Sequence, residues 1–112
     1  MSDDAPPEGN ANSGAGAGVP EGALSTELLI VNKRGLHARA SAKFVQTVER
    51  FNAQVWVTRG GETVGGTSIM GLMMLAAGPG TTITVAAAGS DAEAALAAIT
   101  ELVESKFNEE GT

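Results

Sequence analysis

The chain has no cysteine, no tyrosine and no long apolar run. Without cysteine it can form no disulfide and offers no thiolate ligands to a metal, which fits a reducing, cytoplasmic setting. No apolar stretch approaches the length of a membrane-spanning helix, and residues 1–5 are unlike a signal peptide, so we expect no membrane association. The scarcity of aromatic residues and the net charge of −6 argue against nucleic-acid binding.

The 112 residues suffice for one small domain with some excess. Residues 1–23 hold almost no bulky side chain, so they cannot offset their ordering entropy by burial and are predicted to be a disordered tail. We place the domain at residues 24–108 and a flexible C-terminus at residues 109–112. Although the net charge is negative, a cluster of cations in the middle of the chain predicts a basic face for an acidic partner: Lys33, Arg34, Arg39, Lys43, Arg50 and Arg59.

The apolar pattern predicts four strands, at residues 26–31, 54–58, 63–65 and 81–87. Apolar residues at helical spacing predict three helices, at about residues 38–50, at residues 69–76 and from residue 92 to about residue 107. Ser68 is expected as the N-cap of the second helix, and Ser90 with Glu93 as a capping box for the third. This order of elements predicts an α+β fold with helices covering one face of a mostly antiparallel sheet.

The only histidine, His37, lies where the first predicted strand gives way to the first helix. The first N–H groups of a helix have no partner of their own, and with the positive end of the helix dipole they can hold an anion. Arg39 adds a fixed charge and a forked donor set suited to phosphate. These residues predict a histidine that accepts a phosphoryl group and passes it on. A solvated or capping histidine is the alternative interpretation of the same spacing.

The segment Gly35-Leu36-His37-Ala38-Arg39, followed by an Ala- and Ser-rich helix, resembles the active-site signature of the histidine-containing phosphocarrier family, HPr and its nitrogen-branch relative. Residues 67–75 resemble the regulatory-serine segment of the same family. The two signatures stand in the right order within residues 28–107, and the pair is far more specific than either alone. The resemblance implies the HPr open-faced β-sandwich of four antiparallel strands and three helices.

The resemblance also implies a phosphocarrier of the bacterial phosphotransferase system rather than an enzyme that turns over a small molecule. His37 would take a phosphoryl group from phosphorylated enzyme I, carry it on Nδ1 and donate it to an enzyme IIA-type protein. Arg39 would stabilise the phosphate, and the N–H groups of Ala38 and Arg39 would bind its oxygens, without a metal or another cofactor. Ser68 would be phosphorylated by an HPr kinase/phosphorylase, because a helix start favours the added negative charge.

The second predicted helix is apolar on nearly every side and cannot bury all of its side chains against one sheet. We expect Ile69, Met70 and Met73 to form an exposed docking surface, at positions that match the family's partner contacts. The other large apolar residues of this helix are expected in the core: Leu72, Met74 and Leu75. The protein is expected to be a monomer.

The chain departs from the family pattern near this signature. Ala40 stands where the family usually has proline, which removes a stiff first helical turn but no chemical group. Gln46 and Glu49 stand where many relatives carry lysine, so the docking face is less basic. The pair Ala40-Ser41 resembles nitrogen-branch members, whose output would be regulatory signalling more than sugar uptake.

Two further functions stay open. One is a phosphocarrier-like regulatory module that no longer transfers phosphate and is switched through Ser68. The other is a small α+β module that binds a ligand or RNA, against which the acidic charge and the absence of tyrosine argue.

Overall fold

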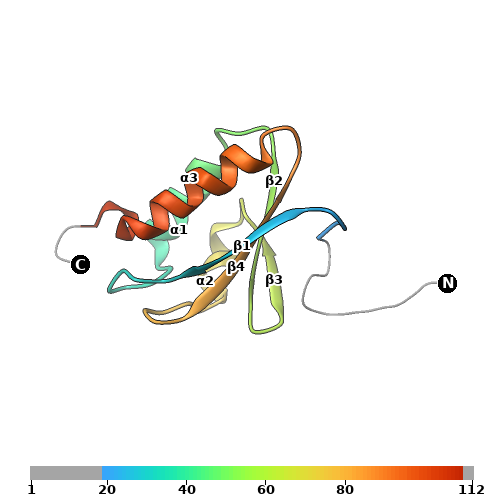
Figure 1. Ribbon diagram of the computed structural model, residues 1–112. Helices are drawn as coiled ribbons and strands as arrows, with labels where there is room; N and C mark the ends of the chain where they lie inside the picture. Colours follow the sequence, from blue (N-terminus) through green and yellow to red (C-terminus); the bar gives the residue numbers. More distant parts are fainter. Residues whose placement is uncertain (1–18, 110–112) are drawn as a thin grey trace.

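The computed structural model of the chain describes residues 19–109, so most of the predicted tail, residues 1–18, lies outside the described part. Four strands form one sheet: β1 (Leu24–Leu29), β2 (Gln54–Arg59), β3 (Glu62–Gly65) and β4 (Thr82–Ala88). Their order across the sheet is β1-β4-β2-β3, and every neighbouring pair is antiparallel (Figure 1). The predicted antiparallel sheet is therefore confirmed.

Three helices pack on the sheet: α1 (Ala38–Val48), α2 (Ile69–Met74) and α3 (Ala92–Glu104), followed by a short turn, η1 (Lys106–Asn108). Figure 1 shows α1 and α3 side by side on the same side of the sheet, and α2 packs against α1 and β3. This arrangement confirms the predicted α+β fold. Within residues 19–109, no helix is long and apolar enough to cross a membrane.

The core lies between the sheet and the helices. The central strand β4 contributes Ile83 and Val85, which are fully buried, because alternate residues of a strand point to the same face. The helices cover them with side chains spaced three or four residues apart. These are also completely buried: Phe44 on α1, Leu72 on α2, and Ile99 and Val103 on α3.

Two local predictions are wrong. Met74 was expected in the core but is 73% exposed, because α2 has only six residues and Leu72 and Leu75 already occupy its inward side. The helix α3 begins at Ala92 with Asp91 as its N-cap, and no side chain caps it. Asp91 Oδ2 instead accepts from the Asn52 N–H at 2.7 Å, and Ser90 Oγ lies 2.8 Å from Asn52 Nδ2. These side chains tie α3 to the loop after α1 and form no capping box.

Candidate functional site

His37 is the N-cap of α1 and has an extended backbone, with φ −76° and ψ −178°. Its imidazole makes no capping hydrogen bond to the helix, and 23% of its side chain is exposed. The predicted position of His37 at the junction between strand and helix is confirmed. Because α1 begins at Ala38, the N–H groups of Ala38 and Arg39 have no partner within the helix.

The loop before His37 is fixed by contacts with the end of α2. Gly35 has a φ of +64°, and a Cβ atom there would lie 2.3 Å from the Ala77 carbonyl oxygen. The next N–H, that of Leu36, donates to the same carbonyl at 3.0 Å, and the Leu36 side chain is buried. Ser41 Oγ donates back to the Leu36 carbonyl at 3.2 Å. The histidine therefore follows a segment with little freedom to move.

Two cations on α1 flank the histidine end of the site. Arg39, two residues after His37, is exposed and makes no hydrogen bond or ion pair within the described part of the chain. Lys43, one turn further, donates from Nζ to the Phe107 carbonyl at 2.6 Å. Arg59, also counted in the predicted basic face, instead donates to the Leu75 carbonyl at 3.0 Å, at the end of α2. Of these three cations, Arg39 is the one whose charged group is left available to an incoming anion.

Glu109 reaches the site from the other end of the chain. Its carboxylate contacts His37 Nε2 through Oε2, and only 12% of its side chain is exposed. Asn32 Nδ2 lies 3.3 Å from Oε1 and 3.4 Å from Oε2 of the same carboxylate. Burial alone would raise the pKa of Glu109, but hydrogen bonds from His37 and Asn32, with the electrostatic attraction of His37 and Lys43, outweigh it and lower that pKa.

Sequence reasoning missed Glu109 and Asn32 as members of the site. Glu109 is 72 residues from His37 along the chain, and no periodicity or motif links the two. Asn32 was visible only as part of the turn that precedes the signature. Their contribution depends on how the chain folds back after α3, which local patterns do not encode.

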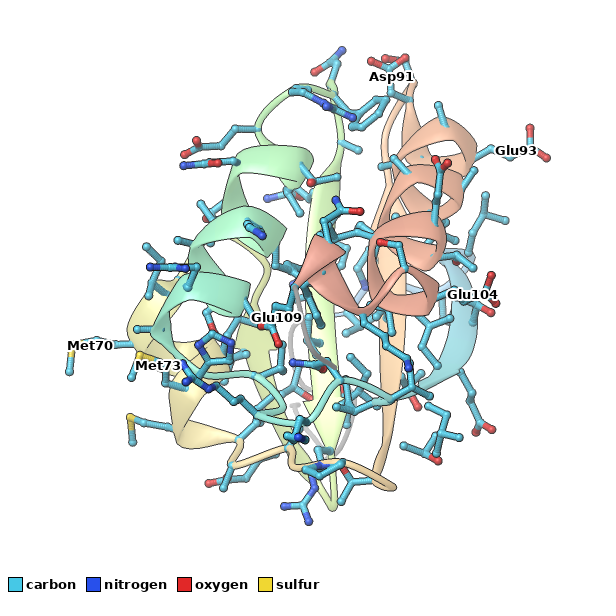
Figure 2. The ribbon with its side chains drawn as sticks, turned by 90° about the vertical axis from the view of Figure 1, so that its left-hand side faces the viewer. Met70, Met73, Asp91, Glu93, Glu104 and Glu109 are labelled. Atoms are coloured by element: carbon cyan, nitrogen blue, oxygen red, sulfur yellow. The ribbon has the colours of Figure 1, made fainter. Side chains whose placement is uncertain are left out.

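Ser68 is the N-cap of α2, as predicted, and its exposed Oγ accepts from the Gly71 N–H at 2.9 Å. The three residues predicted for docking lie on the outer side of this helix, where Ile69 is 40%, Met70 73% and Met73 42% exposed. In Figure 2, Met70, Met73 and Glu109 lie in the lower half of the view, away from Asp91 and Glu93 at the upper end. In this view the Glu109 side chain and the exposed methionines therefore lie toward the same end of the molecule.

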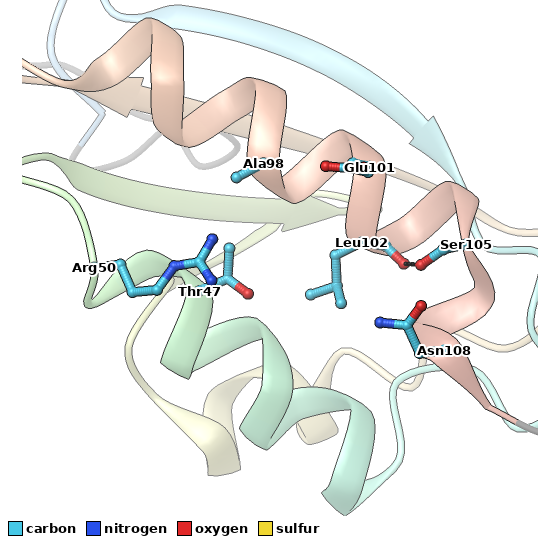
Figure 3. Close-up of a pocket in the computed structure, with 7 residues that line it drawn as sticks. All are labelled: Thr47, Arg50, Ala98, Glu101, Leu102, Ser105 and Asn108. Carbon is cyan, nitrogen blue, oxygen red and sulfur yellow. Dashed lines mark hydrogen bonds between the residues drawn. The ribbon is translucent and has the colours of Figure 1, made fainter.

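A pocket opens between α1 and α3, and His37 is not among its lining residues (Figure 3). None of the predicted site residues lines it; its walls are Thr47, Arg50, Ala98, Glu101, Leu102, Ser105 and Asn108. Within residues 19–109, no three His, Cys, Asp or Glu side chains are grouped so that they could hold a metal ion.

The fold and the site define a class: a small α+β protein with one partly exposed histidine at an uncapped helix start. Comparison with known families agrees, because residues 24–105 match the family described as the PTS HPr component phosphorylation site. The chain belongs to this HPr family of phosphocarriers of the phosphotransferase system.

The similarity to individual relatives covers nearly the whole length of each relative. The phosphocarrier protein HPr of Neisseria meningitidis serogroup A is 50% identical over 86 residues, which cover 77% of this chain and 97% of that protein. The phosphocarrier protein NPr of Shewanella violacea is 43% identical, covering 77% of this chain and 94% of that protein. The crystal structure of HPr from Thermoanaerobacter tengcongensis has a TM-score of 0.74 and 44% identity, covering 78% of this chain and 98% of that one.

Proposed function

We propose that His37 carries a phosphoryl group between two proteins of the phosphotransferase system, taking it from phosphorylated enzyme I and giving it to an enzyme IIA-type protein. The observation that carries this proposal is the open start of α1. The imidazole there is partly exposed and makes no capping bond, next to backbone N–H groups that have no helical partner. This arrangement supports the proposal, because an imidazole nucleophile would then have donors for the phosphoryl oxygens beside it.

Arg39 and the N–H groups of Ala38 and Arg39 are proposed to hold the oxygens of the phosphoryl group. The guanidinium is exposed and unengaged within the described residues, so it can turn toward the phosphate without breaking an existing contact. Donors arranged beforehand around the transferring group stabilise the charge that develops on it. The proposed step needs no metal bound to this protein.

Ile69, Met70 and Met73 are proposed to form the surface on which enzyme I and the acceptor dock. A patch of exposed apolar side chains on one short helix is typical of a protein interface, and methionine adapts to more than one partner. Transfer requires brief contacts with two proteins in turn, which a small patch on a monomer can provide.

Ser68 is proposed as a regulatory site for an HPr kinase/phosphorylase. Its hydroxyl is exposed and lies directly before the docking helix, so a phosphate there would place negative charge beside the docking surface. The choice between the nitrogen and sugar branches stays a prediction from Ala40-Ser41, because relatives named HPr and NPr both match.

Labelling with radioactive phosphoenolpyruvate, enzyme I from the same organism and magnesium, which serves enzyme I, tests the proposal. The wild-type protein should acquire acid-labile phosphate that maps to His37, and adding an enzyme IIA-type protein should remove it. His37→Ala should acquire none, while Ser68→Ala should still be labelled. If wild type stays unlabelled beside an active enzyme I, the carrier proposal fails and the regulatory module switched through Ser68 becomes the better explanation.

A further inference from the structure

The chain folds back over the start of α1 after α3 ends. Lys106, Phe107 and Asn108 all have positive φ values, of 60°, 56° and 56°, which residues with a side chain rarely adopt in succession. The Phe107 side chain is completely buried and its carbonyl accepts from Lys43 Nζ, so packing and a charged donor hold this left-handed turn in place. Strain of this kind persists only where the surrounding structure enforces it, and it often marks a functional site.

The left-handed turn places the Glu109 carboxylate against His37, and Asn32 also contacts that carboxylate. One Asn32 Nδ2 hydrogen points to the Gly35 carbonyl at 2.9 Å, and the same nitrogen faces both oxygens of the Glu109 carboxylate. The opposite amide orientation would place Oδ1 against three acceptor oxygens, so the amide can only face them with its N–H groups. Asn32 is fully buried and its Oδ1 has no partner within residues 19–109, an arrangement that is unfavourable for stability alone.

We propose that Glu109 is a positioning residue for phosphoryl transfer at His37: its carboxylate holds the imidazole proton on Nε2 and leaves the lone pair of Nδ1 free to attack phosphorus. This inference rests on the proposed carrier function and adds to it a residue from outside both signature segments. An ionised carboxylate only accepts hydrogen bonds, so the nitrogen that it contacts must carry the proton. A glutamate with its ordinary pKa of 4.5 is already ionised at neutral pH, and the pKa of Glu109 is lowered further by its hydrogen bonds to His37 and Asn32.

The chemical step balances without a proton leaving the ring. The Nδ1 lone pair forms the new N–P bond, and the P–N bond to the phosphohistidine of enzyme I breaks, its electron pair returning to that imidazole. Because the proton stays on Nε2, the His37 ring becomes positively charged as the N–P bond forms. The Glu109 carboxylate faces this charge directly, and Asn32 keeps it in place. In the onward transfer the same proton lets His37 leave as a neutral imidazole rather than an imidazolate.

The tautomer can be measured without any partner protein. NMR of the imidazole nitrogens of the full chain should show the Nε2–H tautomer strongly favoured in the neutral ring. Glu109→Gln should yield a mixture of both tautomers, because a neutral amide can present either a donor or an acceptor to the ring. Glu104→Gln is the matched control with the same loss of charge: Glu104 is exposed, and Figure 2 places it on the far side of α3 from Glu109. A wild-type tautomer ratio in Glu109→Gln would overturn the proposal.

The rate of labelling by limiting phosphorylated enzyme I provides the second readout. Glu109→Gln should be labelled on His37 roughly 10-fold more slowly, as is typical when a carboxylate that orients a histidine is removed. Glu109→Asp keeps the charge and should recover part of that loss, and Glu104→Gln should match wild type. If Glu109→Gln is labelled as fast as Glu104→Gln, the positioning role is wrong while the carrier function stands. If even wild type is unlabelled, the carrier function fails, and the tautomer ratio still decides whether Glu109 orients the ring.

Discussion

At the start of α2, the Ser68 hydroxyl accepts a hydrogen bond from the Gly71 N–H at 2.9 Å, whereas at the start of α1 the His37 ring makes no capping bond. Both helices begin with N–H groups that lack partners, and only α2 satisfies one of them with its own cap. The ring of His37 turns instead to Glu109, at the far end of the chain. The comparison separates a helix start that is closed by its own cap from one whose first donors are left without a cap.

The open start of α1 is held in place by contacts from outside the helix. Gly35 packs against the Ala77 carbonyl and the Leu36 N–H donates to it, while Lys43 donates to the carbonyl of Phe107 in the turn that precedes Glu109. That turn contains three residues in the left-handed region, a conformation that costs roughly 1–3 kcal/mol for each such residue. The α2 start needs no such support, because its cap lies within three residues of its partner. An unfilled helix start is thus maintained by contacts that are distant in sequence.

Disrupting the contact between Gly35 and the Ala77 carbonyl should cause the largest loss of stability. In Gly35→Ala, the new Cβ would lie 2.3 Å from the Ala77 carbonyl oxygen at a φ of +64°, so overpacking adds to backbone strain. We expect a loss of about 3 kcal/mol in the free energy of unfolding, measured with urea. Gly60→Ala is the control, since Gly60 has a φ of +58° but nothing within 4 Å of a Cβ, and it should lose only about 1 kcal/mol. Equal losses would show that the contact with Ala77 does not matter.

Removing the cation at the open start should affect transfer rather than stability. Arg39→Ala should slow labelling of His37 by phosphorylated enzyme I about 100-fold, the effect typical of losing one donor to a transferring group. Its unfolding free energy should stay near that of wild type, because the Arg39 side chain is exposed and makes no hydrogen bond or ion pair within residues 19–109. Arg50→Ala removes the same charge beyond the other end of α1 and should transfer normally. A comparable slowing in Arg50→Ala would mean that overall charge, not the helix start, governs the rate.

The same contrast explains what the sequence could predict. Ser68 was identified as a cap because its partner is three residues away, and His37 was placed at a helix start because the apolar period changes there. The sheet followed from alternating apolar residues and its turns. Asp91 was missed as the cap of α3 because Ser90 and Asp91 bond to Asn52, which is distant in sequence. Met74 was misplaced because the short length of α2, rather than its composition, decides how many side chains it can bury.

Removing the Ser68 cap at the start of α2 should cause a moderate loss of stability. Ser68→Ala leaves the Gly71 N–H without its acceptor and should lower the free energy of unfolding by about 1 kcal/mol in urea. Thr67→Ala is a suitable control, because Thr67 is exposed, adjacent and makes no side-chain hydrogen bond within the described residues. A Cβ at Gly71 would lie 2.9 Å from Ser68 Oγ, so Gly71→Ala should disturb the same cap from the other side. If Ser68→Ala proves as stable as Thr67→Ala, the start of α2 is not closed by this hydroxyl.

The smallest expected effect is on the pH dependence of stability, through the contact between Glu109 and the His37 ring. Glu109 has a pKa below its ordinary value of 4.5, so its carboxylate binds protons less readily in the folded than in the unfolded chain, and its contribution to stability is fully present above that ordinary value. The contribution is lost as the pH falls through the lower, folded-state pKa. Wild type should therefore be more stable than Glu109→Gln by roughly 0.5 kcal/mol near neutrality, as expected for a partly solvated pair. Thermal unfolding measured against pH should show this difference vanish in acid, with Glu104→Gln parallel to wild type throughout. A stability difference between wild type and Glu109→Gln that persists unchanged in acid would mean that Glu109 contributes through packing. The charge of its carboxylate would then not stabilise the contact with the His37 ring.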